Sequence, residues 1–172
     1  MNPDDISSAS QYLTFNLGDD EFALEISKVR EVVDYAPVTK VPRMPEYLCG
    51  VINLRGNVVS VVDLRLKLGM GRIRKTEDTC IVIVDVLMEG DVLQVGILAD
   101  SVQEVIDLDT EQIQPPPGIG TKLDTQFVRG MGKRKENDFA IILDIDRVLA
   151  DNRTAVALLP GEHLPEEAFD VP

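Results

Sequence analysis

The sequence predicts an all-β fold with short helices, arranged as two small barrels in tandem and related by a pseudo-twofold axis. Short apolar strands recur along the chain with turn residues between them, which favours a small barrel or sandwich. The plan of the first half then returns in the second half. A length of 172 residues fits one ordinary domain or two very small ones. Hydrophobic residues make up 44% of the chain but aromatics only 5%, so Val, Ile and Leu must fill the interior.

The first half begins with an alternating strand over residues 11–17, which places Leu13, Phe15 and Leu17 on one side. Gly18 opens a turn, and residues 21–26 return as the partner strand. Residues 27–33 are amphipathic and fit either a helical turn or a strand edge. A second hairpin follows over residues 50–62, and Asp63 caps a short helix because its carboxylate accepts unpaired backbone N–H groups.

The second half repeats this order with a hairpin over residues 80–98 and a last hairpin over residues 127–143. Asp144 caps the helix that follows. Between the hairpins, residues 101–107 begin with Ser101 and Glu104 at the spacing of a capping box, which indicates a helix start. A proline-rich stretch at 115–117 comes next.

The internal repeat can be tested residue by residue. Residues 28–34 read KVREVVD and residues 101–107 read SVQEVID, so Val29 matches Val102 and Glu31 matches Glu104. Gly50 corresponds to Gly130, and the strand that ends at Asp63 corresponds to the one that ends at Asp144. We therefore expect one domain over residues 11–150 with two intertwined barrels, a flexible arm at 1–10 and a helix or acidic tail at 151–172.

The formal charge of −13 argues against nucleic acid and anionic membranes as partners, since both need a basic footprint. Cys49 and Cys80 lie beside apolar runs, as buried reduced thiols do. No stretch has the form of a signal peptide or reaches the length of a membrane span. We expect a soluble, cytoplasmic protein without direct insertion into the membrane.

A search for chemistry finds no catalytic residue, no metal site and no cofactor motif. The single histidine, His163, lies in the acidic tail, where a general base would lack a walled pocket. Residues 118–122 (GIGTK) fail the pattern of a phosphate-binding loop. The carboxylate pairs 19–20 and 144–146 sit at element boundaries, where Asp serves as a cap or turn residue.

The string Asn53-Leu54-Arg55-Gly56 has two interpretations. It is either a plain exposed turn, or it presents Arg55 to a partner, since a planar guanidinium donates several hydrogen bonds at once. Glu31 is likewise either a solvated charge or a contact residue. The valines of residues 29–33 and 102–106 are either core or the lining of an apolar groove that a helix could enter.

These strings resemble the CheW family of chemotaxis coupling proteins. The likeness covers about residues 11–149 and rests on the NLRG turn, the VVDLR strand ending and the DxVxEV segment, in order and at the family's spacing. It implies two five-stranded SH3-like barrels that share a hydrophobic seam. It also implies a non-enzymatic adaptor that couples methyl-accepting chemoreceptor tips to the regulatory domain of the histidine kinase CheA, in arrays at the inner membrane.

Site residues follow from the resemblance by position. The receptor-facing surface is implied at Val29, Glu31, Asn53, Arg55, Gly56, Val102 and Val105. The kinase contact is implied at Gln114 and Ile119, where the family leads us to expect a basic and an aromatic residue. The alternatives are a CheW-like coupler of a non-flagellar system, such as pilus or second-messenger control, an enzyme, and a β-barrel nucleic-acid binder.

Overall fold

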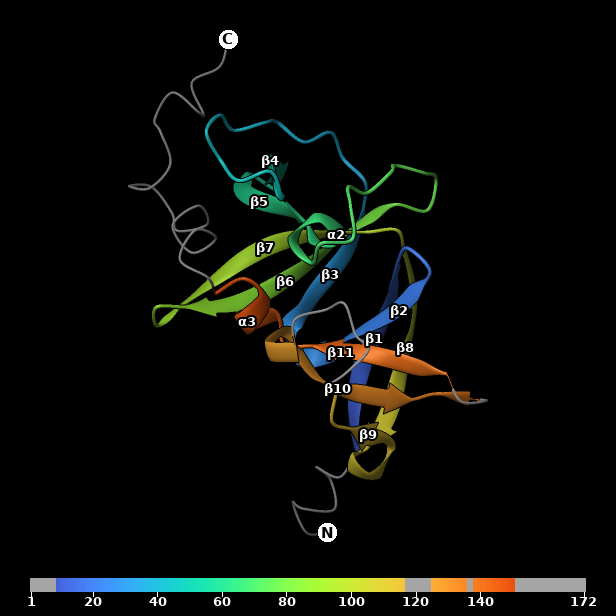
Figure 1. Ribbon diagram of the computed structural model, residues 1–172. Helices are drawn as coiled ribbons and strands as arrows, with labels where there is room; N and C mark the ends of the chain where they lie inside the picture. The colour runs from blue at the N-terminus through green and yellow to red at the C-terminus, as the bar shows by residue number, and fades with distance from the viewer. Residues whose placement is uncertain (1–8, 117–124, 136–137, 151–172) are drawn as a thin grey trace.

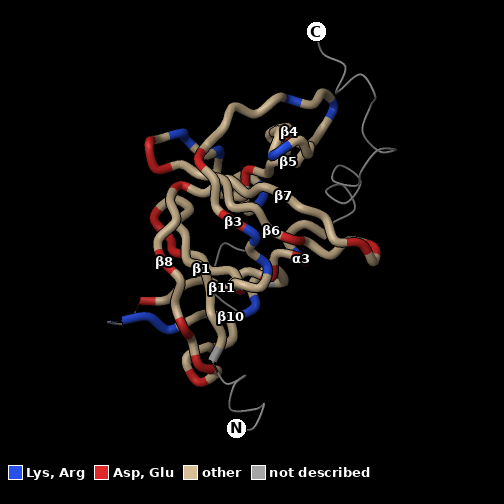
Figure 2. The backbone as a smooth tube through the Cα atoms, turned by 180° about the vertical axis from the view of Figure 1, so that it is seen from behind, with Lys and Arg blue, Asp and Glu red and all other residues tan. Residues whose placement is uncertain are grey.

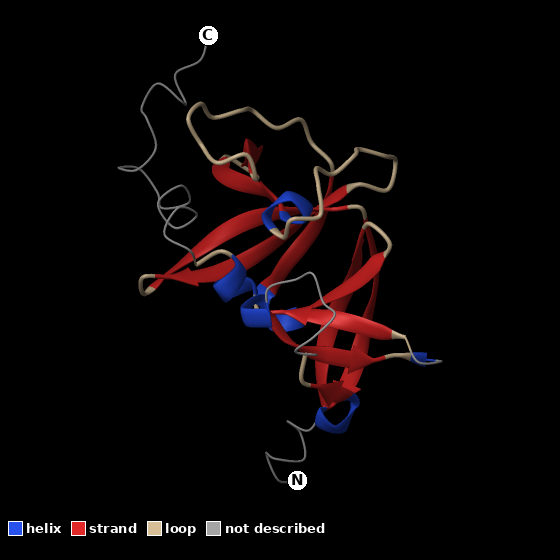
Figure 3. Cartoon of the chain, in the orientation of Figure 1, coloured by secondary structure: helices blue, strands red, loops and turns tan. Residues whose placement is uncertain are grey.

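The computed structural model describes residues 9–116, 125–135 and 138–150. Strands dominate it, and the helices are single short turns (Figure 3). In chain order the strands are β1 Ala9–Leu17, β2 Asp20–Glu25, β3 Val29–Asp34, β4 Leu48–Leu54, β5 Asn57–Asp63, β6 Cys80–Met88, β7 Asp91–Ala99, β8 Ser101–Asp109, β9 Ile113–Gln114, β10 Val128–Lys133 and β11 Phe139–Leu143. The helices are η1 Ile26–Lys28, α2 Leu64–Lys67, η2 Thr110–Gln112, η3 Thr125–Phe127 and α3 Ile145–Val148.

The strands form two sheets with the same internal order. Sheet A runs β8-β1-β2-β11-β10-β9, and sheet B runs β3-β6-β7-β5-β4. Both contain one parallel pair, β2 with β11 and β7 with β5. The two-residue β9, the sixth strand of sheet A, has its counterpart in an isolated bridge between Thr39 and Val51 beside β4. The predicted all-β fold with two related five-stranded units is therefore confirmed.

Each half of the chain contributes its first hairpin to the sheet of the other half. The β1–β2 hairpin pairs with β8 and β11, while the β6–β7 hairpin pairs with β3 and β5 (Figure 1). The repeat seen in the sequence thus relates equivalent strands of two intertwined sheets. β3 and β8, which carry the matched valines and glutamates, both lie at sheet edges.

Two glycines of the repeat stand at matched irregularities. The register shifts between Leu48 and Gly50 in sheet B and between Val128 and Gly130 in sheet A. A Cβ atom on Gly50 would lie 2.0 Å from the carbonyl oxygen of Thr39. A Cβ on Gly130 would lie 2.7 Å from Cγ2 of Ile113. Close approach of a neighbouring chain segment therefore requires glycine at both positions.

The hydrophobic core has three parts. One cluster fills the interior of sheet A, with Tyr12 and Ile106 among its members, and another fills sheet B, with Ile81 and Ile83. The largest cluster, here called the seam, lies between the sheets. Its members come from both, as the following buried residues show: Leu13, Phe15, Leu17, Phe22 and Leu24 from the first hairpin, and Val82, Val84, Val86, Val95 and Ile97 from the second.

The two exchanged hairpins are buried on both faces, which explains their sequence. Along β6 every residue from Cys80 to Val84 is buried, with alternate side chains in the seam and inside sheet B. Strands covered on both sides read as continuous apolar runs rather than as an alternating pattern. The phenyl rings of Phe15 and Phe22 stack with centroids 6.1 Å apart in the seam.

Both predicted helix caps are present. The carboxylate of Asp63 accepts a hydrogen bond from Leu66 N at the start of α2, and that of Asp144 accepts one from Arg147 N at the start of α3. The helix start predicted at Ser101 is wrong, because Ser101–Asp109 is strand β8. Ile106 and Leu108 are buried in sheet A, so period-two burial against β1 decides the conformation. A capping box does occur nearby, from Asp109 to Gln112.

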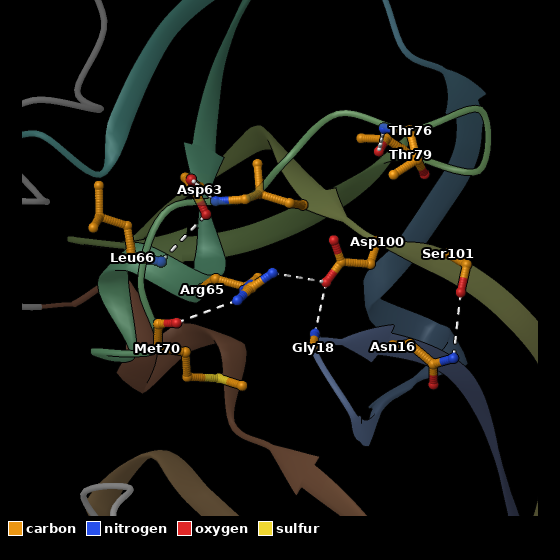
Figure 4. Close-up of polar contacts among 11 residues, drawn as sticks. Asn16, Gly18, Asp63, Arg65, Leu66, Met70, Thr76, Thr79, Asp100 and Ser101 are labelled. Carbon is orange, nitrogen blue, oxygen red and sulfur yellow. Dashed lines mark hydrogen bonds and ion pairs between the residues drawn. The ribbon is translucent and has the colours of Figure 1, made fainter.

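Polar contacts also join the two sheets (Figure 4). Asp100, in the link between β7 and β8, accepts a 2.6 Å hydrogen bond from Gly18 N in the β1–β2 turn and lies 3.4 Å from Arg65 of α2. Within sheet A, Asn16 of β1 also donates a hydrogen bond to the hydroxyl of Ser101 at the start of β8. The last two residues of the expected flexible arm belong to a strand, because β1 begins at Ala9. Residues 1–8 and 151–172 lie outside the described part.

The seam yields a stability prediction. Phe15→Ala should lower the free energy of unfolding by about 3–5 kcal/mol, because it removes a fully buried ring and leaves a cavity between the sheets. Urea denaturation followed by circular dichroism measures the change. Leu87→Ala, at a side chain 54% exposed, is the control and should stay within about 0.5 kcal/mol. A loss below about 1 kcal/mol for Phe15→Ala would contradict the seam as a main source of stability.

Candidate functional site

The turn between β4 and β5 is a tight two-residue connection. Leu54 pairs with Asn57 across it, and Arg55 and Gly56 both have positive φ, 52° and 88°. These are the angles of the type I′ hairpin turn, which glycine tolerates most readily at its second position. The side chain of Asn53 accepts a 2.8 Å hydrogen bond from Gly56 N, so Asn53 braces the turn. This rigid, exposed hairpin tip is compatible both with a plain turn and with a turn that presents Arg55 to a partner.

Arg55 forms a two-pronged ion pair with Glu31. Its two terminal nitrogens each donate a 2.6 Å hydrogen bond to a different carboxylate oxygen of Glu31 on β3. Since β3 and β4 are the outer strands of sheet B, the pair links the two edges of that sheet. The Arg55 side chain is 69% exposed and that of Glu31 is 30% exposed, so the pair lies at the surface. Arg55 thus has a partner within the chain and remains accessible to another.

Sheet A contains an equivalent ion pair that the sequence did not reveal. Arg134, in the β10–β11 connection, donates 2.9 Å hydrogen bonds to Glu104 of β8 and to Glu21 of β2. Glu104 is the repeat partner of Glu31, and the β10–β11 hairpin is the counterpart of β4–β5. The signal was available, because the repeat aligns the two glutamates and both following hairpins carry Arg. The pair borders a charged hollow of about 490 Å³ that Asp19, Asp20 and Phe139 also line.

The predicted receptor-facing residues fall on both sheets. Glu31, Asn53, Arg55 and Gly56 lie together where the β4–β5 turn meets β3 of sheet B. Val29 and Val102, from β3 and β8, are partly buried and pack against the seam. Val105 lies on the outer side of β8 and is 49% exposed, as is Val32 on β3 at 42%. The valines therefore divide between core and surface, and those exposed on the two edge strands are free for contact.

The predicted kinase-contact residues are only partly described. Gln114 lies on β9 at the far edge of sheet A and is exposed, paired with Met131. Ile119 lies outside the described residues, as do the 118–122 loop and His163. The structure thus places one of these two residues, on β9, which follows β8 after the short helix η2.

The groups capable of chemistry serve structural roles where they are described. Burial raises the pKa of the Cys49 thiol to about 11 and also raises that of Cys80, which disfavours reactive thiolates. Asp146 accepts hydrogen bonds from Lys28 Nζ and Leu87 N, which fasten α3 to η1 and β6.

Within residues 9–116, 125–135 and 138–150, no set of three His, Cys, Asp or Glu side chains is arranged to hold a metal ion. No helix among them is long and apolar enough to cross a membrane.

The ion pair predicts a titration. The hydrogen bonds from Arg55 lower the pKa of the Glu31 carboxyl below its ordinary value, and the charge of Arg30 adds to this. Because the folded-state pKa is depressed, the stabilisation is present at neutral pH and is lost as the pH falls through that pKa. In Arg55→Ala the pKa of Glu31 should rise toward that of an unperturbed Glu. Side-chain carboxyl NMR measures both values, and equal values would show that the pair does not form in solution.

Comparison with known proteins places this geometry in a family. Residues 11–153 match the model of the CheW-like domain. The chain is 35% identical over 146 residues to the chemotaxis protein CheW of Klebsiella aerogenes, covering 85% of both chains. It is 29% identical over 158 residues to that of Bacillus subtilis, covering 92% of this chain and 97% of the relative.

A solved structure has the same fold. The scaffolding protein TtCheW of Thermoanaerobacter tengcongensis superposes with a TM-score of 0.73 at 36% sequence identity, covering 83% of this chain and 89% of that one. Both the length and the order of elements are therefore shared with proteins of this kind. The chain belongs to the CheW family of chemotaxis proteins.

Proposed function

We propose that this protein is a non-enzymatic adaptor that couples the cytoplasmic tips of methyl-accepting chemoreceptors to the histidine kinase CheA. The family membership supports a chemotaxis role, and the name of the solved relative describes a scaffold. The observation that carries the site assignment is the rigid β4–β5 turn, which holds Arg55 at 69% exposure while two hydrogen bonds to Glu31 fix its direction. A preorganised guanidinium loses little freedom when it binds, which favours its use as a contact.

The receptor contact is proposed along the edge strands. Arg55, Glu31 and Asn53 of sheet B supply the polar part, while Val29 on β3 and Val102 and Val105 on β8 supply the apolar part. An amphipathic coiled-coil tip would place its apolar side chains on the valines and its carboxylates or carbonyls on Arg55. The kinase contact is proposed around Gln114 on β9 and at Ile119, which lies outside the described residues. Two separate surfaces are what an adaptor needs to hold both partners at once.

The same surfaces would serve a coupler in a non-flagellar chemosensory system, because the residues do not distinguish one receptor class from another. Pull-down of the cognate kinase from the source cell separates these two candidates. Recruitment to receptor arrays at the inner membrane follows from the proposed receptor contact, since the receptors themselves supply the anchor.

The proposal predicts how Arg55→Ala behaves. The melting temperature should change little, because solvent screens an exposed ion pair and such pairs contribute little to stability. Receptor binding should weaken roughly thirtyfold, as loss of an interface Arg commonly costs about 2 kcal/mol. CheA binding, on another surface, should remain within about twofold. Calorimetry and co-sedimentation with receptor fragments and kinase measure the three quantities.

A matched control separates the site from general surface charge. Arg129→Ala removes a similarly exposed Arg, 50% accessible and paired with Glu25 on sheet A, and should leave receptor binding unchanged. If Arg55→Ala melts far below the wild type, Arg55 is a structural residue. If both variants bind receptor as the wild type does, the receptor contact does not lie at the β4–β5 turn.

A further inference from the structure

A basic segment interrupts this acidic chain. Five of the 17 Lys and Arg residues lie within the eleven positions from Arg65 to Lys75, and that stretch holds no Asp or Glu. Glu77 and Asp78 follow it after Thr76, and the chain as a whole carries −13. Arg72, Arg74 and Lys75 lie in the connection between α2 and β6, which also contains Glu77 and Asp78. Figure 2 shows acidic residues along β8 in sheet A. Such an excess of one sign makes this connection a local anion-attracting surface.

Hydrogen bonds to Asp63 hold the connection between α2 and β6 in place. One carboxylate oxygen of Asp63 accepts a hydrogen bond from Leu66 N, and the other accepts a 2.9 Å bond from Ile73 N (Figure 4). Ile73 is half-buried against the interior cluster of sheet B. Arg72 and Arg74 flank this anchored residue and are exposed. The Asp63 carboxylate therefore fixes a backbone position from which two guanidinium groups project outward.

The cations of the segment differ in their contacts. Arg65 pairs with Asp100, Lys67 Nζ lies 4.5 Å from the centre of the Tyr47 ring, and Lys75 Nζ lies 5.2 Å from the centre of the Tyr35 ring. With the rest of the described chain, Arg72 and Arg74 form neither an ion pair nor a hydrogen bond. These two guanidinium groups are the ones open to an anionic partner.

We propose that the acidic segment 162–170 of this same chain docks on Arg72 and Arg74. It carries Glu162, Glu166, Glu167 and Asp170 and no Lys or Arg. It lies beyond residue 153, where the match to the family model ends.

The chain leaves the described fold at a suitable place. Val148 and Leu149, at the end of α3, pack in the same seam cluster as Leu64 and Leu68 of α2, from which the basic segment continues. The eleven residues 151–161 can span up to about 36 Å when extended. A tethered partner of this kind is present at an effective concentration in the millimolar range, so weak ion pairs suffice for docking.

Charge favours this occupant over a membrane or a nucleic acid. An extended polyanion would face the rest of a −13 molecule as well as the basic segment, at distances within a few Debye lengths of about 8 Å. A short acidic segment contacts only the cations. Docking on two exposed Arg groups should be sensitive to salt, since such pairs are screened.

Amide NMR on the full chain tests the proposal. The wild type is compared with a tail-neutralised variant, E162Q/E166Q/E167Q/D170N, in 50 mM NaCl. The amides of residues 72–75 should shift between the two proteins, and the difference should fall at least fivefold in 1 M NaCl, where the Debye length is about 3 Å. A synthetic peptide of residues 160–172 added to the tail-neutralised variant should restore the wild-type shifts with saturation.

Charge reversal locates the surface. R72E/R74E should move the tail amides to the chemical shifts of an undocked tail. K133E/K135E, which makes the same change in charge on the β10–β11 hairpin of sheet A, should leave the tail amides at their wild-type chemical shifts. Unchanged amides at 72–75 upon tail neutralisation would overturn the proposal. So would an equal effect of the two reversal pairs, which would indicate general electrostatics. Docking of the peptide at another basic surface would assign the tail a different site and contradict the one proposed.

Discussion

Burial of two hairpins on both of their faces is the constraint on which this structure depends. The β1–β2 and β6–β7 hairpins each leave their own half of the chain, complete the other half's sheet, and then pack against one another across the seam. If one sheet unfolded, the apolar side chains that the other sheet buries in the seam would become exposed to water. The fold should therefore act as one cooperative unit, although each sheet has its own interior cluster.

The same exchange places the functional edges. Because the exchanged hairpins occupy the inner positions of each sheet, the repeated strands β3 and β8 are left at the outside. Their alternate residues Val32 and Val105 are exposed, while Glu31 and Glu104 each meet an Arg from the following hairpin. The two barrels thus carry the same ion pair. They differ in that Arg134 has two carboxylate partners, whereas Arg55 has one and is far more exposed.

Much of this fold could be predicted from local sequence. Alternation located the strands, Asp63 and Asp144 indicated their helix starts, and the Val29/Val102 repeat identified equivalent strands, because each of these signals acts within a few residues. Intertwined barrels were expected, but which hairpins exchange could not be predicted, since periodicity assigns a face to each strand and not its partner strand. Capping-box spacing at Ser101 failed because burial of Ile106 and Leu108 outweighs local capping. Arg55 was identified as a candidate, but its bonding to Glu31, 24 residues away, needed the structure.

The central claim is that the seam makes the two intertwined sheets one unit, which native-state hydrogen exchange measures directly. In low denaturant, the amides of β1 in sheet A and of β6 in sheet B should open with the same free energy, equal to that of global unfolding. Phe15 and Val84, both fully buried in the seam, are suitable reporters. A lower opening free energy for all of sheet A than for sheet B would mean that the sheets unfold separately and would contradict the account.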